Sequence, residues 1–235
     1  MEPMVILAAG AHPDDVEIGM GGTIALHANR GDIVYICNVT KGELSSNGTV
    51  ETRQQEAARA AAVLGVAERY QLHFPDRSLS QSHPEYYSLV SLIRELKPDV
   101  IFAPYKDRHP DHGACGEVVQ AAIFDAGIKR FPKVKGAPHK TAAFYQYFIN
   151  GVPEPDFYMD ISRSRSVKEK ALLAYESQFV KKPGSVDTPL TDQYIETVRR
   201  RDLLFGKEAG TEAAEGFKQV TPFLFSALPK RGTDS

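Results

Sequence analysis

The chain has 235 residues, of which 42% are hydrophobic and 25% are charged, and its formal net charge is -2. These proportions are ordinary for a globular protein with a buried core, so they exclude a chain that is mainly disordered. The charge balance lacks the basic excess of nucleic-acid-binding proteins, and no block rich in Lys or Arg occurs. We therefore expect no nucleic-acid partner.

The apolar stretches of the chain are short. None approaches the roughly 20 residues that a membrane-spanning helix requires, and residues 1–10 lack the basic leader of a secretion signal. We therefore expect no membrane partner and a cytoplasmic location. Cys37 and Cys115 are too few for a disulfide framework, and we predict that both are buried free thiols.

Hydrophobic periodicity predicts strands that alternate with helices along the first half of the chain. Four strand and helix pairs are expected, at residues 4–9 and 18–30, 33–39 and 51–64, 70–74 and 85–96, and 100–103 and 112–126. The second helix is expected to begin near a capping box at Thr52 to Gln55 and to stop at Gly65. Such alternation is typical of a doubly wound sheet with helices on both faces. The predicted fold class is therefore α/β, with a Rossmann-like, mostly parallel sheet.

The alternation of strands and helices ends after residue 140. There the hydrophobic pattern predicts a strand at 141–149 and helices at about 166–177 and 191–205. We expect these elements to complete a single domain over residues 1–228, followed by a flexible tail at 229–235. Segments rich in glycine and proline at 133–138 and 181–189 are predicted to be surface loops that border a cleft.

Two polar clusters follow predicted strands. The first, His12-Pro13-Asp14-Asp15, comes directly after the first strand, and the second, Asp107-Arg108-His109-Pro110-Asp111-His112, comes after the fourth. In the commonest winding of an open α/β sheet these strands are neighbours, and ligands bind at their carboxyl ends. The two clusters are therefore expected to face each other across a cleft, as a metal site requires.

The residue types in these clusters suit a hydrolytic zinc centre. Catalytic zinc takes three nitrogen or oxygen ligands and keeps a fourth position for water, which two histidines and an aspartate would satisfy. Of the adjacent carboxylates Asp14 and Asp15, one can bind the metal while the other acts as a base. Of His109 and His112, one can bind while the other offers a proton or a hydrogen bond.

The first cluster and its continuation also resemble the signature of a known family, the LmbE-like (PIG-L) zinc N-deacetylases. The resemblance rests on Ala11-His12-Pro13-Asp14-Asp15-Val16-Glu17-Ile18-Gly19 followed by Gly21-Gly22-Thr23, and on His109-Pro110-Asp111-His112 as the second motif. It extends through Thr40-Lys41-Gly42-Glu43, Arg53, Pro75-Asp76 and Tyr175-Glu176-Ser177-Gln178, and so covers nearly the whole chain.

The resemblance implies a metal site and a base. By position, His12, Asp15 and His112 would bind one Zn2+ ion per chain, and Asp14 would be the general base that activates water for attack on the amide carbonyl. Arg53 would steady the Asp14 carboxylate or grip the substrate.

It also implies residues that act on the reacting amide. His109 would stabilise the tetrahedral oxyanion in its protonated form or protonate the leaving amine, and Asp111 would hold the His109 imidazole. Tyr194 would close over the reacting carbonyl.

Within the family, the chain most resembles the bacillithiol-pathway deacetylases, which implies N-acetylglucosaminyl malate as the substrate and a symmetric homo-oligomer, with a hexamer as the expected form. The two carboxylates of malate would need cations, for which Arg53, Arg108 and Lys140 are candidates. Other acetylated amino sugars, including chitin oligosaccharides and mycothiol-type precursors, remain alternatives.

The sequence disfavours two other classes of protein but leaves the choice of metal open. A nucleotide-binding module is disfavoured because the first loop lacks a G-x-G-x-x-G turn and places carboxylates where phosphate would approach. A structural zinc site is disfavoured because such sites favour cysteine, and neither cysteine lies in a cluster. Iron, cobalt and manganese remain open as alternatives to zinc.

Overall fold

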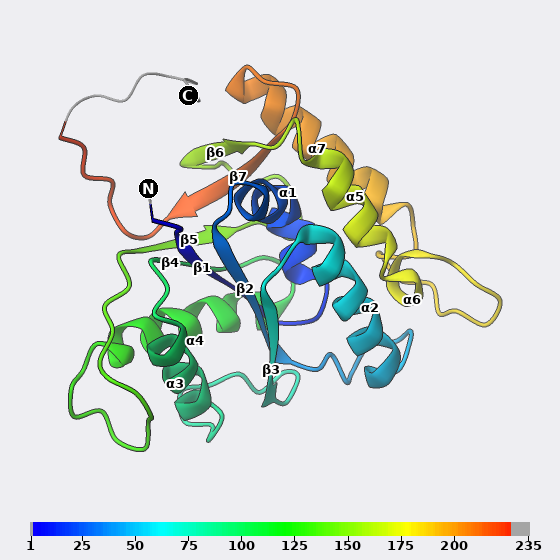
Figure 1. The fold of residues 1–235 in the computed structure, drawn as a ribbon. Helices are drawn as coiled ribbons and strands as arrows, with labels where there is room; N and C mark the ends of the chain where they lie inside the picture. The colour runs from blue at the N-terminus through cyan, green and yellow to red at the C-terminus, as the bar shows by residue number, and fades with distance from the viewer. Residues whose placement is uncertain (1, 227–235) are drawn as a thin grey trace.

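A computed structural model describes residues 2–226, in which a seven-stranded sheet carries helices on both faces (Figure 1). The strands are β1 Val5–Gly10, β2 Ile33–Thr40, β3 Glu68–Phe74, β4 Val100–Pro104, β5 Ala143–Tyr147, β6 Phe157–Asp160 and β7 Ala214–Gln219. The helices are α1 Asp15–Asn29, α2 Val50–Leu64, α3 Tyr86–Leu96, α4 Pro110–Ala126, α5 Arg165–Leu173, α6 Glu176–Phe179 and α7 Tyr194–Ala209. The predicted tail at residues 229–235 lies outside the described residues.

The strand order is β3-β2-β1-β4-β5-β7-β6, and the pairs among β1 to β5 are parallel. This confirms the Rossmann-like α/β fold and the predicted adjacency of the first and fourth strands. β7 runs antiparallel to β5 and β6. Neither β6 nor β7 was predicted, because β6 is only four residues long and β7 is buried over consecutive residues and so shows no alternating pattern.

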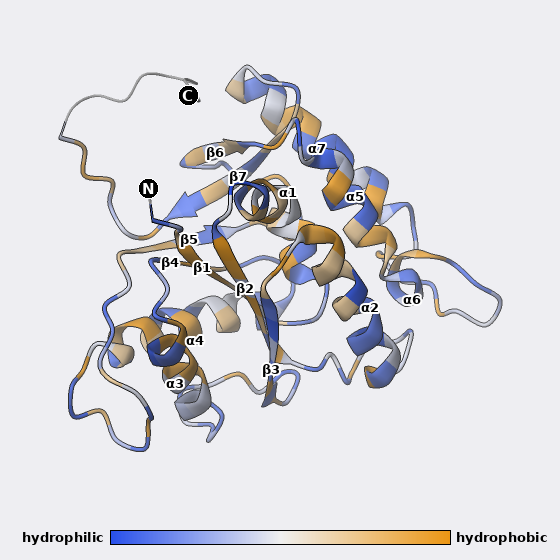
Figure 2. Cartoon of the chain, in the orientation of Figure 1, coloured by the Kyte–Doolittle hydropathy of each residue, from blue (hydrophilic) through white to orange (hydrophobic). Residues whose placement is uncertain are grey.

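The sheet separates two apolar cores. Along β1, Ile6 and Ala8 face the core covered by α1, α2, α5 and α7, whereas Leu7 and Ala9 face the core covered by α3 and α4. Successive side chains of a strand point to opposite faces, so a strand buried on both sides reads as a continuous apolar run. Figure 2 shows this run as the hydrophobic colour of β1 and β2. Cys37 and Cys115 are free and buried, as predicted.

Several helix boundaries differ from the predictions. Helix α2 is capped by Thr49, whose side chain accepts from the Thr52 N–H at 3.2 Å, so the cap is not the predicted Thr52 to Gln55 box. The helix predicted over residues 166–177 is two helices, because the backbone of Tyr175 leaves the helical region between α5 and α6. Helices α1 and α4 begin inside the two polar clusters, at Asp15 and Pro110.

Among the described residues, no helix is both long enough and apolar enough to cross a membrane.

Candidate metal and catalytic site

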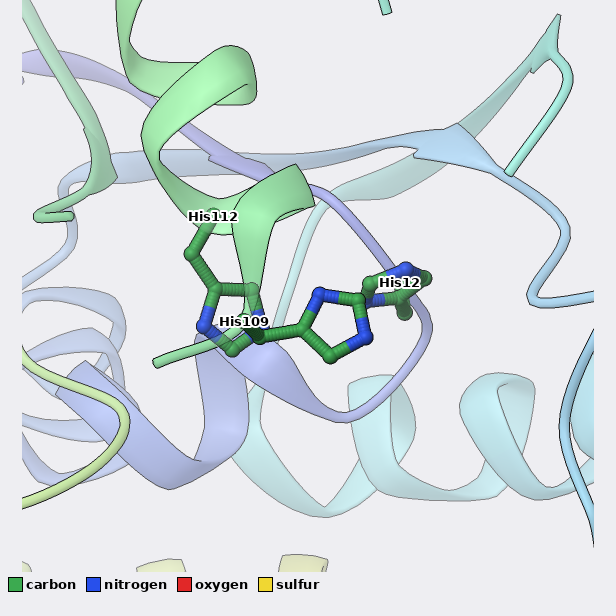
Figure 3. A group of neighbouring side chains, drawn as sticks. All are labelled: His12, His109 and His112. Carbon is green, nitrogen blue, oxygen red and sulfur yellow. The ribbon is translucent and has the colours of Figure 1, made fainter. Parts of the chain in front are cut away.

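The parallel pairing of β1 with β4 brings the two polar clusters together at the carboxyl ends of these strands. Figure 3 shows His12 on the loop after β1, and His109 and His112 at the start of α4. The His12 ring lies 4.8 Å from the His109 ring and 5.8 Å from the His112 ring, centroid to centroid. Residues almost a hundred positions apart in the chain therefore line one small site.

Asp15 lies between two of these histidines. Its Oδ2 is 3.3 Å from His12 Nδ1, and its Oδ1 is 3.2 Å from His112 Nε2. Zinc bonds to nitrogen and oxygen of about 2.0–2.2 Å in a tetrahedron separate neighbouring ligand atoms by roughly 3.3 Å. Each of the two distances from Asp15 is close to this value, although they run from different oxygens of its carboxylate. One nitrogen each of His12, His109 and His112 also lie within 4.8 Å of one another, so His109 borders the same position.

A carboxylate stands behind each predicted ligand histidine. His12 Nε2 is 3.2 Å from Asp111 Oδ2, and His112 Nδ1 is 2.8 Å from Asp107 Oδ2. A histidine that donates one ring N–H to a carboxylate presents the lone pair of its other nitrogen to a metal. These contacts therefore select Nδ1 of His12 and Nε2 of His112, the nitrogens that face Asp15.

The electrostatics of the site favour a bound cation. Burial lowers the pKa of His12, but the carboxylates of Asp15, Asp111 and Asp76 raise it to about 10. Burial likewise lowers the pKa of His112, and Asp15 and Asp107 raise it to about 9. The Asp76 Oδ1 atom is buried without a hydrogen-bond partner and lies 3.9 Å from His12 Nε2. Carboxylates that hold protons on two histidines also stabilise a divalent cation in their place, so the donor set fits a metal.

Asp14 has an unusual backbone conformation. Its φ of 106° is rare for a residue other than glycine. Arg53 Nη2 donates to Asp14 Oδ2 at 3.0 Å, which matches the predicted contact between the two side chains. Burial raises the pKa of Asp14 to about 7, with the Arg53 guanidinium opposing the rise and Asp15 adding to it.

The loop that carries Asp14 is fixed through its carbonyl groups. Thr40 donates to the Ala11 carbonyl at 2.9 Å, Asn38 donates to the His12 carbonyl at 2.8 Å, and Arg53 donates to the Pro13 carbonyl. These three donors lie on β2 and α2. A strained backbone persists only where its surroundings fix it, and three successive bonds supply that constraint.

The predicted role of Asp111 is wrong in one respect. Its carboxylate contacts His12 Nε2 and accepts from the Arg77 backbone N–H at 3.0 Å, so it does not hold the His109 imidazole. It is the Asp111 backbone N–H that donates to His109 Nδ1, at 3.3 Å. Burial and the charges of His12 and His112 lower the pKa of His109, so the environment favours the neutral ring over the predicted protonated one. A neutral ring that accepts at Nδ1 carries its proton on Nε2.

A cavity of about 430 Å3 opens over the site and includes all nine predicted site residues in its lining. Arg53 is almost fully buried and also donates to the Gly42 carbonyl at 3.4 Å. Tyr194 lies in the wall, but its hydroxyl is 3.0 Å from both the Ile149 carbonyl and Asn150 Oδ1. The hydroxyl proton is therefore already used within the protein.

Of the other predicted cations, Arg108 is exposed at the cavity, with Nη2 3.3 Å from Asn150 Oδ1. Lys140 does not line the cavity. It precedes β5 and lies against Gly127 at the end of α4, at the opposite edge of the sheet, so its proposed contact with substrate is wrong. The loop that carries it follows a helix, whereas the site is built from loops that follow strands.

Several residues at the site carried no predicted role, among them Asp107, Asn150 and Arg77. Asp107 orients His112 and also accepts from Asn150 Nδ2 at 2.9 Å. Arg77 lines the cavity, with a side chain that is about half exposed. The position of Asp107, five residues before a predicted ligand histidine, was a usable signal, but Asn150 and Arg77 come from segments whose approach depends on the fold.

A doubly wound α/β sheet with a histidine and aspartate site at the carboxyl ends of β1 and β4, beside a second buried carboxylate, defines a hydrolase-type domain suited to metal-assisted chemistry. The profile of the PIG-L family, described as GlcNAc-PI de-N-acetylase, matches residues 7–123. The chain belongs to this PIG-L (LmbE-like) family, and it is an N-deacetylase enzyme.

The relatives cover most of the chain. The sequence is 31% identical to the diacetylchitobiose deacetylase of Thermococcus kodakarensis, over 95% of this chain and 86% of that protein. It is 29% identical to a probable N-acetyl-alpha-D-glucosaminyl L-malate deacetylase 2 of Bacillus subtilis, over 74% of this chain and 82% of that protein. The structure is similar to the crystal structure of the conserved protein TT1542 from Thermus thermophilus, with a TM-score of 0.85, 35% identity, and coverage of 96% of this chain and 98% of that one.

Proposed function

We propose that the enzyme removes the acetyl group from the amino sugar of an N-acetylglucosamine conjugate, with a metal ion held by His12, Asp15 and His112. The observation that carries the proposal is the pair of adjacent carboxylates with different partners. Asp15 Oδ2 lies 3.3 Å from His12 Nδ1 and Asp15 Oδ1 lies 3.2 Å from His112 Nε2, whereas the one side chain bound to the Asp14 carboxylate within residues 2–226 is Arg53. One carboxylate is thus placed to bind a metal and the other to accept a proton.

We propose Zn2+ as the ion, which when bound lowers the pKa of a water molecule to about 7 and polarises a carbonyl group. Asp14 accepts a proton from the water that attacks the acetyl carbonyl, while Arg53 keeps its carboxylate in place. Transfer of this proton from Asp14 to the amine nitrogen lets the C–N bond break and returns Asp14 to its carboxylate form. The products are the free amine and acetic acid, which then ionises to acetate.

His109 acts on the charge that develops during this attack. Its Nδ1 accepts from the Asp111 backbone N–H, which leaves Nε2 as the donor. A neutral imidazole N–H directed at the carbonyl oxygen stabilises the oxyanion without a prior protonation step. Tyr194 is not needed in this role, because its hydroxyl is committed to Ile149 and Asn150.

Different observations support two different groups attached to the sugar, malate and a second sugar. Arg77 and Arg108 line the cavity and suit the carboxylates of N-acetylglucosaminyl malate, in line with the malate deacetylase relatives. The diacetylchitobiose deacetylase relative, which aligns over more of the chain, supports a second sugar in that place. A cavity of about 430 Å3 falls in the range of pockets that enclose ligands larger than one acetamido group.

The test is acetate release from N-acetylglucosamine, diacetylchitobiose and N-acetylglucosaminyl malate, with zinc-loaded protein and with a chelator-treated control. We expect metal-dependent release from at least one conjugate. Release that is unchanged after the metal is removed would contradict the metal assignment, and absence of release from all three substrates would contradict the proposed function.

The oligomeric state, the location and the domain organisation of the protein stay predictions. They are the homo-oligomer with a hexamer as its expected form, the cytoplasmic location, and a single domain over residues 1–228. Light scattering on the purified protein tests the first directly.

A further inference from the structure

The cavity has two walls of different chemistry. The wall on the side of α3 and α4 carries Asp76, Arg77, Arg108 and Asp111. A second part of the lining comes from two loops that precede α2 and α7, and its residues are all uncharged: Gly42, Leu44, Ser45, Ser46 and Asn47 from one loop, and Thr188, Pro189 and Leu190 from the other. It meets the first part where the Leu44 N–H donates to Asp76 Oδ2 at 2.8 Å. We call this second surface the neutral wall.

The two loops of the neutral wall are joined through one side chain. Asn47 Nδ2 donates to the Val186 carbonyl at 2.8 Å, and Asn47 Oδ1 accepts from the Val186 N–H at 2.9 Å. The Asn47 amide thus pairs with a backbone segment 139 residues away in the same way as a neighbouring strand would. Asn47 is 9% exposed, so water competes little for these bonds.

Helix α6 supports this contact from behind. Gln178 Nε2 donates to the Asn47 carbonyl at 2.7 Å, and Gln178 Oε1 accepts from Ser45 Oγ at 3.1 Å. Ser177 is bound in turn to Glu56 of α2, through its N–H at 2.7 Å and its hydroxyl at 2.6 Å. At Gly48 a Cβ atom would lie 2.6 Å from Ser177 Oγ, so only glycine permits this close approach. Ser177 and Gln178, which no catalytic step uses, therefore fix one wall of the cavity.

The chemistry of the neutral wall restricts what can rest on it. A carboxylate placed there would lose water without meeting a cation, which is costly. Arg53, a buried cation that contacts this wall at the Gly42 carbonyl, is already bound to Asp14 and Pro13 as well. Serine hydroxyls together with the apolar surfaces of Leu44, Pro189 and Leu190 suit a neutral group that bears hydroxyls.

We propose that Asn47 is a specificity-determining residue, which joins the two loops into a binding surface for a neutral sugar attached to the N-acetylglucosamine unit. The inference rests on the proposed deacetylase function and adds the class of the neighbouring group. Asn47 acts through the loops that it connects, because its hydrogen bonds run to Ser45, Gln178 and Val186 and not to the proposed metal ligands or the base. Its loss should therefore change binding of a disaccharide and leave the chemistry of the acetamido group intact.

The experiment compares Asn47→Ala with the wild-type enzyme on N-acetylglucosamine and on diacetylchitobiose, with kcat and KM measured separately. Two lost hydrogen bonds should raise KM for diacetylchitobiose about tenfold, with kcat and the kinetics on N-acetylglucosamine changed by no more than about twofold. Ser185→Ala is the matched control, because Ser185 accepts a hydrogen bond from Lys182 within one of the same loops and does not bridge to the other. We expect the control to match the wild type.

Equal losses on both substrates would show that Asn47 only supports folding, and an unchanged KM for diacetylchitobiose would show that the neutral wall does not bind the second sugar. Either result overturns the inference.

A binding titration separates this inference from the proposed function. The two sugars are titrated calorimetrically into metal-loaded Asp14→Asn, with and without Asn47→Ala. Tighter binding of the disaccharide that is lost with Asn47→Ala supports the inference even if the wild type releases no acetate. Equal binding of both sugars, or no binding, contradicts it.

Discussion

The floor of the cavity, which carries His12, Asp15 and His112, and the neutral wall differ in the interactions that hold them together. On the floor, charged groups are packed against one another: His12 contacts three aspartates and His112 contacts two, with Asp15 common to both. The neutral wall contains no charged lining residue, and its two loops are joined by a single asparagine. Metal binding and proton transfer demand fixed charges at short distances, whereas recognition of a neutral group demands shape and hydroxyl contacts.

Substitutions in the two regions should therefore have different effects on the enzyme. Damage to the floor should abolish metal binding or turnover on every substrate. Damage to a wall should change KM for particular substrates and spare the reaction itself. Substitutions on the floor should therefore have larger effects than substitutions on a wall.

The largest effect is expected for His112→Ala, which removes a proposed metal ligand. Bound zinc should fall from about one ion per chain towards zero, and activity should fall with it to the level of the chelator-treated enzyme. Metal content by elemental analysis is the measurement. His73→Ala is the control, because His73 is exposed and absent from the cavity lining. Full zinc occupancy in His112→Ala would contradict the ligand assignment.

Asp14→Asn should keep the metal and lose turnover. The substitution removes the proton acceptor but leaves an oxygen for Arg53, so we expect kcat to fall about 10²- to 10⁴-fold with normal zinc content. Steady-state kinetics beside metal analysis measure both quantities. A variant with near-normal kcat would show that another group is the base.

Asp107→Asn should weaken metal binding without abolishing it. The Asp107 carboxylate contacts Nδ1 of His112 at 2.8 Å, and replacement of such a partner typically lowers metal affinity about 10- to 100-fold. A competitive titration with a chromogenic chelator gives the affinity. If zinc affinity is unchanged, the carboxylate contributes to loop structure and not to the metal site.

The smallest effect is expected for Arg108→Ala, on the part of the lining that carries Asp76, Arg77 and Asp111. Because Arg108 is exposed, an ion pair with malate should be weak, and KM for the malate conjugate should rise about three- to tenfold. KM for diacetylchitobiose should not change, which is the opposite pattern to that expected for Asn47→Ala. Equal changes in KM for both conjugates would contradict the proposed difference between the two walls.

Much of the floor was predictable from the sequence because its residues lie in two short segments that follow strands. The periodicity of the first four strands and helices is local, and it placed His12, Asp14, Asp15, His109 and His112 at one edge of the sheet before any contact was known. The family resemblance then distinguished the two carboxylates, and the hydrogen bond between Arg53 and Asp14 fits that distinction.

Tertiary structure alone decided the partners of these residues. In the structure the Asp111 carboxylate contacts His12 and not His109, and Asp107 contacts His112. Lys140 lies at the far edge of the sheet. The fold also joins Asn47 to Val186 across 139 residues. Periodicity reports which face of an element is buried, and so it predicts elements and strand ends. The partner of a side chain depends on how distant segments pack, and no local pattern in the sequence encodes that distance.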